Sequence, residues 1–134
     1  VDFEFYKHKV VPYHGANPGR YDLEGVVFAH YLTSGTMGRA ISGDHHAMNL
    51  LKKHHVSSVV GHSHSRDFAQ LTRGDGQDIC ATVVGSYFDH FEGYAGHQNQ
   101  SWWQGVVVLE NFDGKGYYDP RWIPMDELKK EYGE

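Results

Sequence analysis

The sequence predicts a mixed α/β (α+β) fold, in which one βαβ unit is followed by antiparallel strands. Two apolar segments, residues 23–29 and 56–60, each run directly into a histidine-bearing segment. The amphipathic segment between them has the apolar spacing of a helix. Further downstream, apolar segments alternate with short turns rich in Gly and Asp, which is typical of hairpins. We therefore expect a mixed sheet with a single crossover helix.

The crossover helix is predicted over residues 43–54. Apolar residues recur from Ala47 onwards at i, i+3 and i+4, which places them on one face. Ser42 suits the N-cap position, and Asp44 in the first turn would interact favourably with the helix dipole. About three helical turns then connect the two strands, which makes the strands parallel.

The remaining elements are expected from apolar runs bounded by turn-forming residues. They are a short strand near residues 9–11, a hairpin of strands 67–72 and 79–85 around a turn at 73–76, a polar aromatic loop over 87–100, strands 105–111 and 117–123, and a short helix that opens at 124–126.

Composition limits the classes of function. The chain has 134 residues, of which 40% are hydrophobic, so we expect one domain over residues 1–134. Its formal net charge is −5 and its basic residues do not cluster, which gives no indication of an electrostatic nucleic-acid surface. The longest aliphatic run, residues 106–109, is far below the roughly 20 residues of a membrane span. The single cysteine, Cys80, lies in an apolar run, so a buried thiol and a cytoplasmic location without membrane partners are expected.

Histidines follow both strands of the predicted βαβ unit. His30 follows the first strand, and Gly61-His62-Ser63-His64 follows the second. The carboxyl ends of parallel strands meet at one sheet edge, where open α/β sheets bind their ligands. Imidazole is the commonest side-chain metal ligand, and Gly61 permits a sharp turn before the histidine pair. We therefore predict that the three histidines converge as metal ligands.

This arrangement resembles the closing half of the calcineurin-like metallophosphoesterases. An isolated histidine at a strand end and a Gly-His-x-His are the last two of that family's five motifs, with a helix of this size between them. The likeness covers residues 22 to about 110. The long loop over 87–103 and the Gly-Arg-Ala-Ile segment look like the phage and bacterial branch. The resemblance implies the C-terminal half of a phosphoesterase sandwich.

The resemblance also implies a dinuclear metal centre. His30 and His62 would bind one divalent ion and His64 the other, with Mn, Fe, Zn or Ni as suitable metals. Two ions about 3.5 to 4 Å apart can hold a phosphoryl oxygen and a bridging hydroxide together. The implied function is a metal-dependent hydrolase, either a phosphatase or a nuclease. Its substrate would be a phosphomonoester or phosphodiester, with nucleotides and nucleic acids among the candidates.

Other residues near the histidine motifs are candidates for substrate binding and proton transfer. Arg39 and Arg66 flank the two histidine loops and could grip a phosphate oxygen, although loop arginines are more often simply solvated. Tyr31 could shape the pocket or merely pack. Asp89 and His90 follow a predicted strand, and His90 could transfer a proton, with loop capping as the structural alternative.

The first three motifs of the family, which supply the bridging carboxylate and the remaining ligands, have no convincing copy here. Gly43-Asp44-His45-His46 contains Asp-x-His literally, but it lies at a predicted helix start and after His30. We therefore expect the amino-terminal half to lie upstream in the same gene or in a companion chain. The alternative is a truncated or diverged remnant that keeps the fold as a non-catalytic binding module. A histidine-rich metal-responsive module is disfavoured, because its ligands would not need a βαβ frame.

Overall fold

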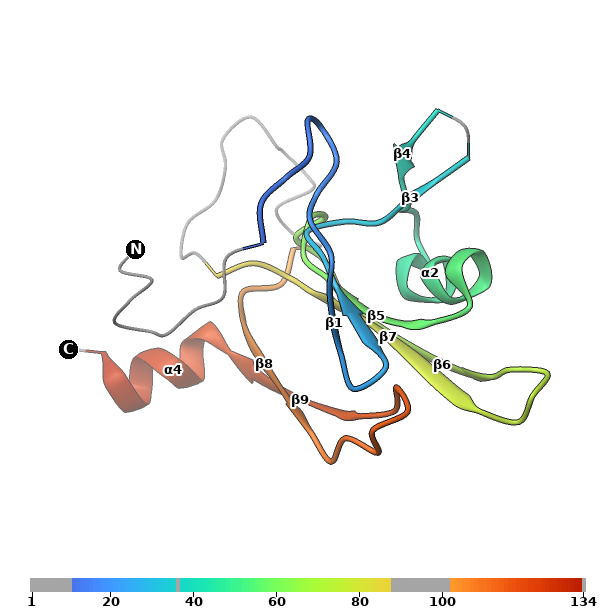
Figure 1. Ribbon diagram of the computed structural model, residues 1–134. Coiled ribbons are helices and arrows are strands. Elements are labelled where there is room, and N and C mark those ends of the chain that lie inside the picture. The colour runs from blue at the N-terminus through green and yellow to red at the C-terminus, as the bar shows by residue number, and fades with distance from the viewer. Residues whose placement is uncertain (1–10, 36, 88–101, 134) are drawn as a thin grey trace.

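The computed structural model describes residues 11–35, 37–87 and 102–133. A five-stranded sheet of order β1-β2-β5-β7-β6 lies between helix α2 on one face and the β8–β9 ribbon on the other (Figure 1). The elements are β1 (Tyr21–Leu23), β2 (Val26–Phe28), β3 (Thr33–Ser34), β4 (Arg39–Ala40), α2 (His46–His54), β5 (Ser57–Val60), β6 (Arg66–Thr72), β7 (Asp78–Val84), β8 (Gly105–Glu110), β9 (Asp119–Pro124) and α4 (Met125–Tyr132).

The predicted βαβ unit is present. Strands β2 and β5 pair in parallel, with Val26 opposite Ser57 and Phe28 opposite Val59, and α2 connects them. Their carboxyl ends therefore lie at the same edge of the sheet. The predicted strand near residues 9–11 and the loop over 87–100 lie largely outside the described residues.

The first strand of this unit is shorter than predicted. The single strand expected over residues 23–29 is a hairpin of β1 and β2, which pair antiparallel. Its two-residue turn consists of Glu24 (φ 51°) and Gly25 (φ 82°), and positive φ at both turn positions matches the twist of a tight hairpin. A second hairpin, β3–β4, lies between β2 and α2, where no strand was predicted.

The later strands are only partly antiparallel. The β6–β7 hairpin is confirmed, and β8 and β9 also pair antiparallel. However, β7 pairs in parallel with β5 on its other edge, with Ser58 opposite Ala81 and Val60 opposite Val83. The continuous burial of residues 79–83 explains this position, because a strand covered on both faces belongs in the centre of a sheet.

Helix α2 begins later than the sequence predicts. Its first residue is His46, so Ser42 is not the N-cap and Asp44 lies outside the first turn. A carboxylate from another element satisfies the helix start instead, because the Ala47 N–H donates to Asp67 Oδ2 at 3.0 Å. The helix ends at His54, and the left-handed conformation of the next residue, His55 (φ 56°), closes the last turn.

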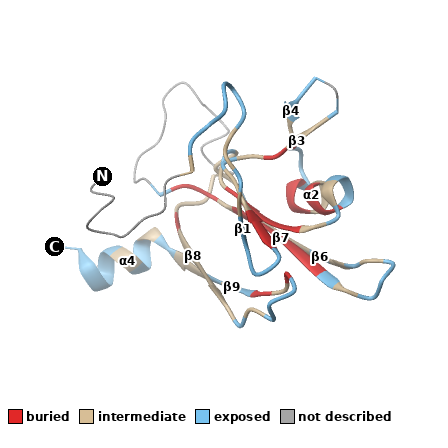
Figure 2. Cartoon of the chain, in the orientation of Figure 1, coloured by how far each residue is buried: buried red, intermediate tan, exposed pale blue. Residues whose placement is uncertain are grey.

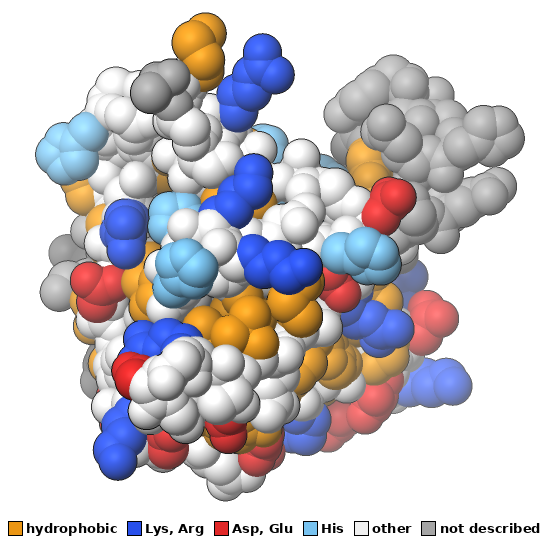
Figure 3. All heavy atoms as spheres, turned by 90° about the vertical axis from the view of Figure 1, so that its right-hand side faces the viewer, with side chains coloured by type: hydrophobic (Ala, Val, Ile, Leu, Met, Phe, Trp, Pro, Cys, Tyr) orange, Lys and Arg blue, Asp and Glu red, His pale blue; other side chains and the backbone are white. Residues whose placement is uncertain are grey.

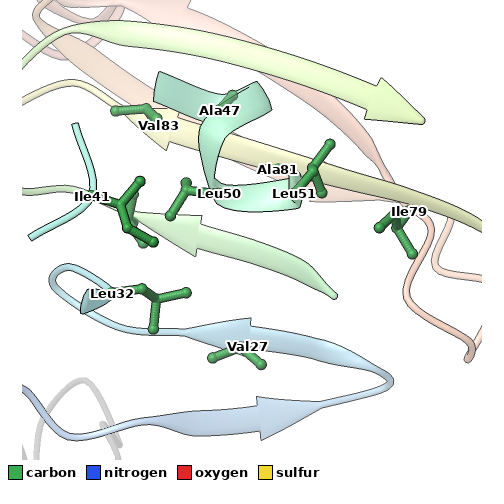
Figure 4. Close-up of a cluster of buried hydrophobic side chains, with 10 residues drawn as sticks. Val27, Leu32, Ile41, Ala47, Leu50, Leu51, Ile79, Ala81 and Val83 are labelled. Carbon is green, nitrogen blue, oxygen red and sulfur yellow. The ribbon is translucent and has the colours of Figure 1, made fainter. Parts of the chain in front are cut away.

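Two apolar clusters lie on the two faces of the sheet, and buried residues concentrate on the central strands and on the sheet-facing side of α2 (Figure 2). Leu50 and Leu51 of α2 pack over Val83, Ala81 and Ile79 in the first cluster (Figure 4). The second cluster consists of Val26, Val59, Cys80 and Tyr118, and the predicted burial of the Cys80 thiol is confirmed.

Surface charge does not form a single-sign field on the face that carries α2. Lysine, arginine and histidine side chains are interspersed there with acidic and uncharged groups (Figure 3). Within residues 11–35, 37–87 and 102–133, no helix is long and apolar enough to cross a membrane.

Candidate metal centre

The centre of the candidate site is a pair of histidines at the shared edge of β2 and β5. His30 Nε2 and His62 Nδ1 lie 2.9 Å apart and share a hydrogen bond. The two rings are nearly perpendicular, at 84°, with centroids 4.9 Å apart. Backbone hydrogen bonds continue the parallel ladder into this edge, since the Gly61 N–H donates to the His30 carbonyl at 3.1 Å. The fold therefore brings together two histidines that are 32 positions apart in the sequence.

Gly61 does not make the sharp turn that the sequence predicts, but it lies in a tight contact with β7. Its φ is not positive, but a Cβ at this position would lie 3.2 Å from Val84 Cγ2. The left-handed residue of the loop is His64, with φ 61°. The glycine therefore allows close approach to β7, and His64 makes the turn.

His64 lies near His30 and His62 but takes no part in the hydrogen bond between them. Its ring packs edge-on against Trp102, with centroids 4.7 Å apart, and its carbonyl accepts the Trp103 N–H at 2.9 Å. It is close enough to His30 for its charge to influence that ring. Among the described residues, no three His, Cys, Asp or Glu side chains are grouped closely enough to hold a metal ion.

The environment of His30 favours the neutral imidazole. Its pKa is lowered, chiefly by desolvation and further by positive charge on His62 or His64. A metal binds the unprotonated ring nitrogen, so this electrostatic setting suits a ligand.

Three other predicted site residues lie within the described part of the chain. Tyr31 packs against His62 at 5.0 Å, and its hydroxyl donates to the Ala16 carbonyl at 2.8 Å. Arg66 is exposed, and its guanidinium lies over the rings of Trp103 and Trp122 at 5.3 and 5.5 Å. Gripping a phosphate would therefore compete with this cation–π stacking. Arg39 is exposed on β4, while Asp89 and His90 lie outside the described residues.

An apolar hollow of about 530 Å³ opens beside His30. Apolar side chains from several strands line it, including Leu23, Phe28, Val59 and Val84, and His30 is among its polar groups. The histidine pair thus lies where a mainly apolar surface meets the edge of the sheet.

His46 is a residue of this region whose role the sequence did not reveal. It is only 2% exposed, and its Nδ1 shares a 3.2 Å hydrogen bond with Ser63 Oγ, in the middle of the Gly-His-Ser-His segment. The available signal was its helical spacing, because His46 precedes Leu50 by one turn and so shares its buried face.

Comparison of this chain with models of known protein families, with curated protein sequences and with solved structures found no match.

Proposed function

We propose that this chain supplies histidine ligands to the dinuclear metal centre of a phosphoesterase. The observation that carries the proposal is the His30–His62 pair at the edge shared by the parallel strands β2 and β5. His64 follows two residues later on the same loop. The order of strand, histidine, helix, strand and Gly-His-x-His is the basis of the resemblance to calcineurin-like metallophosphoesterases, of which this chain would be the C-terminal portion.

The geometry of the pair fits a shared ion. Two imidazole nitrogens on one tetrahedral ion, each at about 2.0–2.1 Å from the metal, lie about 3.3–3.4 Å apart. The observed separation of 2.9 Å requires an opening of only a few tenths of an ångström. Both side chains are exposed, so an ion can reach them from solvent.

Divalent ions at such a site activate water and neutralise charge on the phosphoryl group during in-line attack. The residues of this chain would orient the ions: His30 and His62 hold one, and His64 reaches towards the second. Tyr31, packed on His62, restricts the orientation of that ring. Phosphate esters, including nucleotides and nucleic acids, are the proposed substrate class.

The ligand set needs carboxylates from elsewhere. Three neutral imidazoles bring no negative charge to hold two dications together, and no acidic side chain among the described residues completes a group of three ligands. We therefore propose an amino-terminal half, in cis or as a companion chain, that carries the acidic motifs. The 134-residue chain alone should then hold at most one ion.

A non-catalytic binding module is the second candidate function. It is favoured by the separation of His64 from the His30–His62 pair, because its ring packs on Trp102. In that case the fold would persist as a diverged remnant with one weakly held ion.

Metal binding and hydrolysis test these alternatives. We expect the chain to bind about one equivalent of Co²⁺ or Mn²⁺ and to hydrolyse an aryl phosphate or phosphodiester only marginally. A polypeptide that also carries the upstream motifs should be at least about 100-fold faster, because a lost electrostatic contact of this kind costs roughly 10² to 10³ in rate.

His62→Ala should abolish both metal binding and hydrolysis. His55→Asn, at an exposed left-handed position after the helix end, should change neither. Equal metal binding by wild type and His62→Ala would refute the site. Strong His62-dependent turnover by this chain alone would refute the need for an amino-terminal half. Metal binding without hydrolysis, even with the upstream motifs, would favour the binding module.

A further inference from the structure

The loop over residues 61–65, which carries two of the three candidate ligand histidines, is held from the interior by His46. His46 is the first residue of α2 and is buried between the helix and the sheet. Its Nδ1 shares a 3.2 Å hydrogen bond with Ser63 Oγ, and Ser63 lies directly between His62 and His64. The metal-binding proposal gives no role to His46.

This contact fixes the side of the loop that faces the interior. Ser63 is half-buried and turned towards α2, whereas the exposed His62 is turned towards His30. Ser63 Oγ also shares a 2.9 Å hydrogen bond with Ser65 Oγ. His62 and His64 adjoin Ser63 in this turn, so fixing Ser63 towards α2 constrains the backbone from which both of these side chains project.

The backbone of the loop is held at two other points. At its start the Gly61 N–H donates to the His30 carbonyl at 3.1 Å, and near its end the His64 carbonyl accepts the Trp103 N–H at 2.9 Å. The His46–Ser63 contact lies between these two anchors. It is a side-chain contact through which α2 can influence the orientation of His62 and His64.

Burying the polar ring of His46 at this position costs free energy. Its Nε2 is buried and has no hydrogen-bond partner of normal geometry, although the Ile41 backbone lies near enough to the ring to favour its charged form. An apolar side chain would avoid that desolvation cost at the helix–sheet interface. Retaining a polar group here needs a compensating contact, and the Ser63 hydrogen bond is that contact.

A hydrolytic triad of Ser63, His46 and Asp67 does not explain this arrangement. The Asp67 carboxylate accepts the backbone N–H groups of Ala47 and Phe68, at 3.0 and 2.9 Å, and not the His46 ring. The burial of His46 also keeps its ring from any substrate.

We propose that His46 is a positioning residue that, through Ser63, sets the orientation of His62 and His64 for metal binding. This inference rests on the proposed function. Groups that orient metal ligands typically change metal affinity 10- to 100-fold when they are removed.

Two substitutions of His46 separate positioning from packing. In His46→Asn, the amide occupies about the position of Nδ1 and can keep the bond to Ser63. In His46→Gln, the amide reaches about the position of Nε2, so the bond is lost while a polar amide remains. Ser63→Ala removes the same bond from the loop side, together with the Ser63–Ser65 hydrogen bond, and changes no residue of α2, so it tests the inference even if a His46 variant does not fold.

The first readout is amide hydrogen exchange without metal. We expect the Gly61 and Trp103 amides to exchange at least about 10-fold faster in His46→Gln and Ser63→Ala, and at nearly the wild-type rate in His46→Asn. The Arg73 amide, which donates to the Gln77 carbonyl in the β6–β7 turn, is the internal control and should not change.

The second readout is Co²⁺ affinity, which should weaken about 10-fold in His46→Gln and Ser63→Ala and recover in His46→Asn. Unchanged exchange at Gly61 and Trp103 in both bond-deleting variants would overturn the inference, and so would equal acceleration at Arg73. If the wild type holds no Co²⁺ through His62, the proposed function fails, and loop exchange alone then decides whether His46 positions the loop.

Discussion

Tyr118 shows how a single buried polar side chain joins two parts of the fold. It is fully buried between the main sheet and the segment that leads into β9. Its hydroxyl donates to the Ser58 carbonyl at 3.1 Å and shares a 2.6 Å hydrogen bond with Thr82 Oγ1. Burial raises the pKa of this hydroxyl far above its usual range, so it stays protonated and able to donate.

We expect Tyr118→Phe to destabilise the protein by about 1–3 kcal/mol, because it leaves the buried Thr82 hydroxyl and Ser58 carbonyl without this partner. Urea unfolding measures the change. Tyr132→Phe removes the same atom from a side chain that is 77% exposed, and should change the free energy of unfolding by less than about 0.5 kcal/mol. Equal effects of the two substitutions would contradict the importance of the buried hydroxyl.

At the scale of elements, the start of α2 depends on a strand that comes later in the chain. One carboxylate oxygen of Asp67, in β6, accepts a hydrogen bond from the Ala47 N–H, and the other accepts one from the Phe68 N–H. This contact takes the place of a local N-cap, and it ties the helix to the sheet beside the histidine loop.

Removing this cap should cost about 1 kcal/mol, within a range of about 0.5–2, because the Ala47 N–H then loses its acceptor. Asp67→Ala tests this by urea unfolding, with far-UV circular dichroism to follow the helix. Asp67→Asn keeps an acceptor oxygen and should lose less. Ser42→Ala, at the position that sequence rules favour as N-cap, should have almost no effect, and a larger effect there would show that Ser42 caps the helix in solution.

The elements that the sequence predicted well are those set by local patterns. The spacing of Leu50 and Leu51 indicated the helix, and the turn at 73–76 indicated the β6–β7 hairpin. The errors arose where the decisive partner is distant. The Asp67 cap cannot be recognised from residues near Ser42, and the pairing of β5 with β7 is invisible locally because β6 lies between them in sequence.

The same distinction applies to the candidate site. The meeting of His30 and His62 was predictable, because a βαβ unit brings the ends of its strands to one edge. The packing of His64 on Trp102 and the hydrogen bond between His46 and Ser63 could not be predicted. Both depend on side-chain directions that neighbouring elements set.

For the molecule as a whole, two histidines with lowered pKa values link stability to pH. The pKa values of His30 and His46 are both lowered, chiefly by desolvation, so the folded state binds fewer protons than the unfolded chain in mildly acidic solution. Their contribution to stability is complete above the unfolded pKa of about 6.5 and is lost as pH falls through that value towards the lowered ones.

We therefore expect the free energy of unfolding, measured with a chelator present, to fall as the pH is lowered from about 6.5. The buried His46 can contribute a slope of up to about 1.4 kcal/mol per pH unit, whereas solvent screening makes the contribution of the exposed His30 smaller. His46→Asn should reduce this slope. Asp75 and Asp113, whose pKa values are lowered by hydrogen bonds to their carboxylates, act only below about pH 4 and so do not obscure the effect. A wild-type profile that is flat down to pH 5 would contradict the prediction.

The strand order β1-β2-β5-β7-β6 also bears on the sequence of events during folding. Strands β6 and β7 are neighbours in the chain and can pair before distant segments meet, since closing a short loop costs little entropy. If this hairpin forms first, the other lateral edge of β7 is available to pair with β5, and the far lateral edge of β5 can then pair with β2. In this order the carboxyl ends of β2 and β5, which His30 and His62 follow, come together last. Slow formation of the β6–β7 turn would therefore delay the appearance of the site.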